Sequence, residues 1–219
     1  MDAGAYQATV RTIPARHAER ARYDRATVHA VLDEALICHL AYVREGLPVM
    51  IPTIHARIGE RLYLHGSTGA SNSRAAAGQG IAVCVTATVI DALVLARSAF
   101  HHSMNYRSVI VHGTARPVCD EAERSRALAA VVDHVWPGRS EACREPTPKE
   151  LAATSVLALD LLEVSAKCRT GDPVDDPADL AGPWWAGLVP VTSGLGHPEP
   201  AADLRTGLPS PITPAVARS

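Results

Sequence analysis

Aromatic residues and lysines are scarce in this sequence. Only 4% of the 219 residues are aromatic, so the 47% that are hydrophobic must form an interior built mainly from Ala, Val, Leu and Ile. Of the 21 basic residues only Lys149 and Lys167 are lysines, the arginines are scattered, and the formal net charge is −2. Without a basic patch there is no electrostatic reason to expect nucleic acid or an acidic membrane surface as a partner.

Signals for disulfides, membrane spans and export are also missing. The sequence contains five cysteines, which are Cys38, Cys84, Cys119, Cys143 and Cys168. Their odd number, their wide spacing and the lack of a C-x-x-C pair favour reduced thiols and argue against structural zinc. The longest apolar run, residues 81–90, is about half of what a membrane helix needs, and the N-terminus has no hydrophobic signal-peptide core. We therefore expect a cytoplasmic protein.

The familiar catalytic motifs are absent as well. The ten histidines include no H-E-x-x-H or similar spacing, so no metal site is predicted. There is no G-x-S-x-G elbow, and no cysteine lies in a recognisable nucleophile context. A Gly-rich dinucleotide fingerprint and a P-loop are also missing. Only less specific patterns in the sequence therefore indicate its function.

Short turns join most of the predicted strands, and this favours an antiparallel barrel over a doubly wound sheet. We expect helices over residues 27–36 and 120–135 and strands over 37–44, 47–57, 62–65, 81–89, 92–97, 106–118 and 154–166. The fold class is therefore mainly β (α+β), an antiparallel β-barrel with flanking helices. We divide the chain into an N-terminal arm (1–25), one domain (26–190) and a disordered tail (191–219).

Prolines and glycines mark special positions in two predicted strands and in one turn. Pro48 and Pro52 cannot donate to a strand ladder, so strand 47–57 is expected at a sheet edge or with a bulge, where another group can meet its backbone. Glu45-Gly46 before it is typical of a hairpin turn. Gly113 interrupts strand 106–118, where a bulge or a close approach is expected.

The segment from Leu62 to Arg74 changes abruptly from an alternating strand to a hydroxyl-rich turn that ends in an arginine. Its small residues allow close backbone approach, and Ser71 or Asn72 can cap a short helix that reaches Ala77. Free N–H groups and the Arg74 guanidinium are suited to a phosphate. The same pattern is typical of a simple capped connection, so both interpretations stay open at this point.

A second polar block lies around the loop 98–105. Arg97 and Ser98 follow one predicted strand, and Asn105 to Ser108 begin the next. Two arginines, hydroxyls and an amide on either side of a loop are compatible with ligand binding, and equally with a loop that bonds to itself.

Four segments, in this order and spacing, resemble the pyridoxamine 5'-phosphate oxidase-like proteins of the FMN-binding split-barrel superfamily. They are Gly46 to Thr53, Leu62 to Ser67 with Ser73-Arg74, Asp91 to Ser98, and Asn105 to Val109 with Gly113. Within the superfamily the sequence is most similar to the flavin-nucleotide-binding branch that includes the nitroimidazole-resistance proteins. The resemblance covers residues 22–190.

The resemblance implies a homodimer of six-stranded split barrels with two flavin sites in the interface. It implies that the flavin phosphate is held by Ser73 and Arg74, with help from Ser67 and Asn72. It also implies that the isoalloxazine ring is lined by Ile51, Pro52 and Thr53, and that the pocket is completed by Thr86, Asn105, Arg107 and Ser108. The resemblance further implies that Trp185 reaches the ring from the partner subunit. His65 lies where this branch often has a histidine, and we take it as the candidate catalytic residue; the alternative is a hydrogen-bonded strand histidine.

The function implied is that of a flavin-dependent oxidoreductase. FMN is the expected cofactor, with FAD or the deazaflavin F420 as alternatives, and electrons pass between a reduced nicotinamide and a small organic acceptor or oxygen. The C-terminal region lacks the basic and aromatic residues with which pyridoxamine phosphate oxidases proper hold their substrate, which argues against vitamin B6 oxidation. The second hypothesis is a flavin- or haem-binding module that stores or senses its cofactor.

Overall fold

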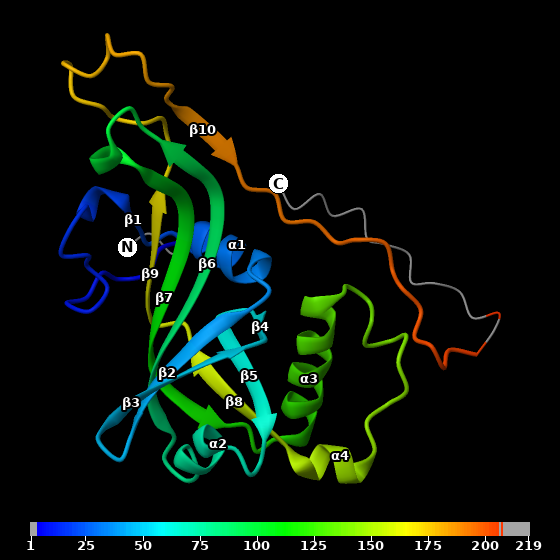
Figure 1. Ribbon diagram of the computed structural model, residues 1–219. Helices are drawn as coiled ribbons and strands as arrows, with labels where there is room; N and C mark the ends of the chain where they lie inside the picture. Colours follow the sequence, from blue (N-terminus) through cyan, green and yellow to red (C-terminus); the bar gives the residue numbers. More distant parts are fainter. Residues whose placement is uncertain (1–3, 206, 208–219) are drawn as a thin grey trace.

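The protein is an antiparallel split β-barrel with helices at its ends and side, as the sequence predicts (Figure 1). The computed structural model describes residues 4–205 and residue 207. Ten strands within these residues form one sheet with the central order β3-β2-β6-β7-β8-β5-β4, while β9 pairs with β1 and β7, and β10 pairs with β6. The number of strands exceeds the six or seven expected because β1 and β10 have no visible pattern in the sequence and two expected strands are each divided, while two others join into β6.

The elements have the following bounds. The strands are β1 (Ala21–Arg22), β2 (Cys38–Arg44), β3 (Leu47–Thr53), β4 (His55–Ile58), β5 (Arg61–Ser67), β6 (Ile81–Leu95), β7 (Ser103–Pro117), β8 (Thr154–Asp160), β9 (Glu163–Arg169) and β10 (Gly187–Pro190). The α-helices are α1 (Arg25–Glu34), α2 (Ser71–Ala75), α3 (Glu121–Val135) and α4 (Pro148–Ala153), and the 3-10 helices are η1 (Ala18–Arg20) and η2 (Ala99–His101).

The hairpin β2–β3 has the turn that its sequence indicates. Glu45 and Gly46 both have positive φ, at 53° and 80°, which is the backbone of a two-residue type I′ turn. Strand β3 lies at the end of the strand order, so the edge position predicted from its prolines is confirmed. The expected strand 47–57 is two strands, because β4 begins at His55 and pairs with β5 instead of β2.

Strands β6 and β7 form the long central hairpin of the barrel. The two strands expected at 81–89 and 92–97 are one strand with a register shift between Ile90 and Ala92. Gly113 shows the predicted close approach and no bulge, because it pairs in register with Val83 and a Cβ atom there would lie 2.7 Å from Cδ1 of Leu159. The predicted strand 154–166 is also divided, into β8 and β9.

The inward-facing residues of the barrel strands and the apolar face of α1 form the main core. Side chains with almost no exposed surface include Val28, Val31, Leu32, Leu40, Leu62, Val85, Val109, Val111, Leu159 and Val164. Helix α1 begins two residues before the predicted start, because Asp24 caps it by accepting a hydrogen bond from the Thr27 N–H (2.8 Å). A smaller core holds α3 against β5 and β8.

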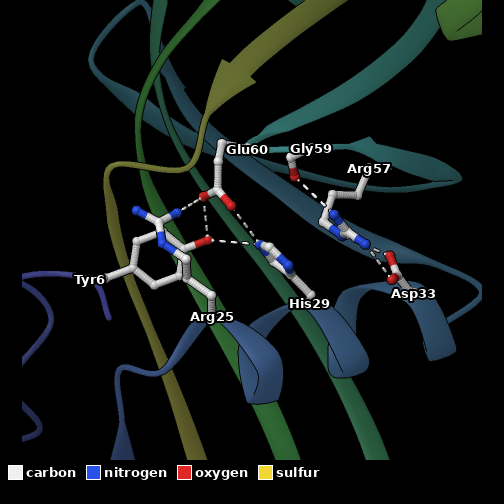
Figure 2. A network of polar contacts seen from close by, with 7 residues as sticks. All are labelled: Tyr6, Arg25, His29, Asp33, Arg57, Gly59 and Glu60. Atoms are coloured by element: carbon white, nitrogen blue, oxygen red, sulfur yellow. Dashed lines mark hydrogen bonds and ion pairs between the residues drawn. The ribbon is translucent and has the colours of Figure 1, made fainter. Parts of the chain in front are cut away.

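Polar contacts fix the N-terminal arm to the barrel (Figure 2). The buried Tyr6 hydroxyl donates to Glu60 (2.8 Å) and lies 3.0 Å from Nε2 of His29. Arg25 pairs with Glu60 and stacks on the Tyr6 ring at 4.5 Å. Further along the arm, β1 pairs with β9, so residues 4–25 lie against the domain instead of running free.

The C-terminal region adds a strand that its sequence does not reveal. Strand β10 pairs with residues 92–95 of β6. Residues 191–205 and 207 have no helix or strand, and the rest of the tail expected to be disordered lies outside the described residues. In the described part of the chain, no helix has the length and hydrophobicity needed to cross a membrane.

The buried ring of His55 makes stability depend on pH. Its Nε2–H donates to the Leu32 carbonyl (2.8 Å), with His134 and Asp33 as its charged or titratable neighbours. Burial lowers its pKa to about 4 from 6.5. Below pH 6.5 the unfolded chain therefore binds a proton that the folded protein excludes, and the free energy of unfolding should fall by about 3 kcal/mol as the pH falls to 4.

Chemical denaturation across this pH range measures the effect. The variant His55→Gln keeps a donor for the Leu32 carbonyl but does not titrate, so its stability should fall less steeply with acidification. Parallel pH profiles for the two proteins would show that His55 is not the group responsible.

Candidate functional site

The hydroxyl-rich turn after β5 leaves an arginine without a partner. Helix α2 begins after Ala70, which makes no side-chain cap, so the predicted capping by Ser71 or Asn72 is wrong; both lie inside the helix. The Ser71 hydroxyl instead lies 2.6 Å from that of Tyr42. Arg74 is exposed, and its guanidinium makes no hydrogen bond or ion pair with any described residue.

Three further predicted residues lie around Arg74. Ser73 is buried, and a Cβ atom on Gly66 would lie 3.9 Å from its hydroxyl oxygen, so β5 ends directly against it. The Ser67 hydroxyl accepts a hydrogen bond from the Gly69 N–H (3.2 Å), and Asn72 is half-buried. The structure therefore gathers Ser67, Asn72, Ser73 and Arg74, the four residues predicted for a phosphate, in one turn.

Edge strand β3 adjoins this turn. Tyr42, which contacts Ser71, is paired with Val49 of β3. Along β3, Ile51 packs against the core, Thr53 is half-buried and Pro52 is exposed. The three residues predicted to line a flavin ring therefore stand on the edge strand, two to four residues along β3 from the position opposite Tyr42.

Thr86 and Ser108 lie on the outer face of the sheet. Pro52, His39, Thr86 and Ile110 are in register across β3, β2, β6 and β7, and their neighbours in sequence fill the core. The Thr86 hydroxyl donates to the Val109 carbonyl (2.9 Å). His39 was not predicted; its alternating position in β2 was the only signal for it.

Arg107 does not share this face. Successive strand residues point to opposite sides, so Arg107 faces inward while Ser108 faces outward. The guanidinium of Arg107 donates to Glu34 at 2.6 and 2.9 Å and to Asp91 at 2.7 to 3.2 Å. Hydrogen bonds to the two carboxylates raise its pKa further above neutrality. We therefore assign Arg107 to the support of α1 and β6 instead of the predicted pocket.

Asn105 and the loop before it are also committed to internal hydrogen bonds. The Asn105 amide donates to the Gly171 carbonyl (3.1 Å) and accepts from Arg169. The N–H groups of Arg97 and Ser98 donate to Asp175, whose side chain is fully enclosed. Burial opposes the ionisation of Asp175, but these hydrogen bonds outweigh it and lower its pKa. The loop thus bonds to its neighbours, which was one of the two interpretations of its sequence.

His65 and Trp185 lie away from the phosphate turn in different ways. His65 faces the same side of β5 as Tyr63, toward α3, whereas Ser73 approaches the opposite side. Burial lowers the pKa of His65, and its enclosed Nδ1 has no partner among the described residues. Trp185 is 65% exposed and precedes β10, at the far end of β6 from α2 (Figure 1). Within one chain Trp185 therefore lies apart from this turn.

The chain matches a known protein family and is similar to two proteins of known structure. Residues 24–168 match the family described as pyridoxamine 5'-phosphate oxidase. The flavocytochrome Anf3 from Azotobacter vinelandii is 38% identical, with 93% of this chain and 94% of that chain covered and a TM-score of 0.86. A FAD and heme binding protein from Mycobacterium smegmatis is 39% identical, with 88% and 94% covered and a TM-score of 0.82.

A more distant structure shares the fold. A Bacteroides thetaiotaomicron protein assigned to 5-nitroimidazole antibiotic resistance is 18% identical, with 67% of this chain and 85% of that chain covered and a TM-score of 0.57. No curated protein matches the sequence. The family match and the two relatives above 30% identity establish that this chain belongs to the pyridoxamine 5'-phosphate oxidase family.

The assignment of Arg107 leads to a testable prediction. Arg107→Gln should lower the free energy of unfolding by roughly 2–4 kcal/mol, because Glu34 and Asp91 then lose their shared cation. Cofactor content per folded protein should stay unchanged. Denaturation and cofactor analysis should be run beside Arg126→Gln, an exposed arginine on α3 expected to change stability by under about 0.5 kcal/mol. A stable Arg107→Gln protein that has lost its cofactor would return Arg107 to the pocket.

Proposed function

We propose that this protein is a flavin-dependent redox protein that also binds haem. The observation that carries the flavin site is the unpartnered Arg74 among hydroxyl groups, next to the free edge of β3. A guanidinium with open donors and nearby hydroxyls suits a phosphate ester, and a free strand edge offers backbone groups to a planar ring. The descriptions of the two relatives at 38% and 39% identity, a flavocytochrome and a FAD and heme binding protein, support this proposal.

FAD is the preferred flavin, ahead of the FMN expected from the sequence, because FAD is named for a relative of 39% identity. Bound flavin supplies transfer of one or two electrons, and the chain supplies binding and electrostatics. Ser73 and Arg74 hold the phosphate, while Ile51, Pro52 and Thr53 position the ring. The donor is a reduced nicotinamide and the acceptor is a small organic molecule or oxygen. In a homodimer, Trp185 of each subunit reaches the site of the other.

Haem binding requires an imidazole that is neutral and accessible. His55, His134 and His29 are already engaged by a carbonyl or a carboxylate. His39 and His112 lie on the outer face without a hydrogen bond to any residue in the described part of the chain, and burial lowers the pKa of His65, which favours its neutral form. The outer face also exposes Met50 and Ile110, at 64% and 39%. Free imidazoles beside apolar surface fit a haem with a histidine ligand.

The absorption spectrum of the protein as purified tests the proposal. We expect flavin absorbance together with a Soret band, FAD on mass analysis of the released cofactor, and NADH- or NADPH-dependent bleaching of the flavin. A Soret band without flavin would remove the flavin half of the proposal, and flavin without haem after reconstitution would remove the other half. A colourless protein that takes up neither cofactor would overturn both.

Replacement of Arg74 tests the assignment of the phosphate. Arg74→Gln should weaken flavin binding roughly 10- to 100-fold, because one charged hydrogen-bonding group is lost. Fluorescence titration of the apoprotein measures this affinity, with Arg139→Gln as an exposed arginine of matched chemistry. Equal flavin affinity in the Arg74 variant and the natural protein would refute the assignment.

A further inference from the structure

A pocket of about 260 Å³ lies between the N-terminal arm and the outer face of the sheet. Residues 11–16 of the arm form one wall. The other wall is the outer face of β7 and β9, which contributes Ser108, Ile110, Ser165 and Lys167. These four residues are two directly opposed pairs in the ladder, Ser108 with Lys167 and Ile110 with Ser165, so they point to the same side of the sheet. The pocket is thus built on regular strands.

The charge balance of this pocket is positive. Arg11 is neutralised, since its guanidinium pairs with Glu163. Arg16 and Lys167 line the pocket and have no ion pair with any residue in 4–205 or 207. The Lys167 ammonium donates to the Arg16 carbonyl (3.2 Å), which holds the arm in place and leaves two of its three protons free. Two cationic residues therefore line this cavity, and none of its lining residues is acidic.

Ser165 gives a second and independent indication of a ligand. The residue is only 8% exposed, yet its hydroxyl has no hydrogen-bond partner among the described residues. The Ser165 hydroxyl is not fully enclosed by the protein, because Ser165 lines the pocket. A polar group this deeply placed normally has a partner, and the cavity that Ser165 lines offers room for one.

We propose that this pocket binds the carboxylate or phosphate group of a small molecule. Arg16 and Lys167 supply charge and the Ser165 hydroxyl supplies a donor at the floor. Ile13 and Pro14 on the arm and Ile110 on the sheet form apolar walls, so the ligand is a small acid with an apolar body. At about 260 Å³ the pocket is smaller than a typical site for a drug-sized ligand, so a small acid fits it better than a whole dinucleotide.

The site shares no residue with the turn at Ser73 and Arg74, but it includes Ser108 of the pocket implied by the family resemblance and Ile110 of the outer face proposed for haem. It also gives the arm a role. Residues 11–16 complete the pocket, and Tyr6 and β1 fasten the chain on either side of them. The arm is thus part of the binding site as well as part of the packing.

Calorimetric titration of the protein as purified, with inorganic phosphate and with benzoate as separate probes, tests this proposal. At least one probe should bind, and the stronger one identifies phosphate or carboxylate as the preferred group. Arg16→Gln and Lys167→Gln should each weaken binding roughly tenfold or more, because each removes a charged donor. Arg126→Gln on α3 is the control and should bind as the natural protein does.

Hydrogen exchange on the unsubstituted protein gives a test that needs no variant. The bound probe should slow exchange of the amides in residues 11–16 and leave those of α3 unchanged. Binding of neither probe would overturn the proposal, as would equal affinities in the Arg16, Lys167 and control variants, or protection confined to another surface. Ser165→Ala, which keeps the backbone, should weaken binding by a smaller factor, and an unchanged affinity would remove Ser165 from the site.

Discussion

The antiparallel pairing of β6 with β7 is the constraint on which the rest of the structure depends. Thirteen residue pairs join these strands, and each successive side chain points to the opposite side. One side carries Val85, Val109 and Val111 into the core. The other carries Thr86, Ser108 and Ile110 to the outer face. A shift of one residue would bury the hydroxyls and expose the core, so the register also fixes which residues can meet a ligand.

This pairing explains why neighbouring residues of one motif have different roles. Arg107 and Ser108 are adjacent in the sequence, yet one pairs with Glu34 and Asp91 and the other lines the pocket below the arm. Arg74 follows the buried Ser73 and Arg16 lines a pocket with the buried Ser165, whereas Arg126 and its neighbour Ser125 are both exposed on α3. Charge alone does not define a candidate site in this protein. A candidate site is defined by a charged side chain near a buried hydroxyl group that has no hydrogen-bond partner among the described residues.

Features that depend on local sequence could be predicted. The turn at Glu45-Gly46 and the edge position of β3 follow from backbone restrictions that one or two residues impose. The grouping of Ser67, Ser73 and Arg74 follows in the same way, because Ser67 and Arg74 are only seven positions apart in the sequence. The short turns between predicted strands indicated an antiparallel barrel, and the family resemblance specified it as a split barrel.

Features that depend on distant contacts could not be predicted. Glu34 lies 73 residues from Arg107, so no local pattern shows that this carboxylate engages the guanidinium. The same holds for β10, whose four residues become a strand only where β6 offers an edge. The N-terminal arm has no periodicity of its own, and its place is set by Tyr6 and by β1 against β9. The pocket below it was therefore invisible in the sequence.

The pairing of β10 with β6 covers a sheet edge that the long hairpin would otherwise leave open. One edge of β6 is occupied by β7 over most of its length, and the opposite edge is shared between β2, at residues 83–86, and β10, at residues 92–95. An open edge in the second half would carry Leu93 and free backbone groups, which is the arrangement that lets sheets of separate molecules join. Because Val189 and its neighbours pair with this part of β6, those backbone groups are already hydrogen-bonded within the chain.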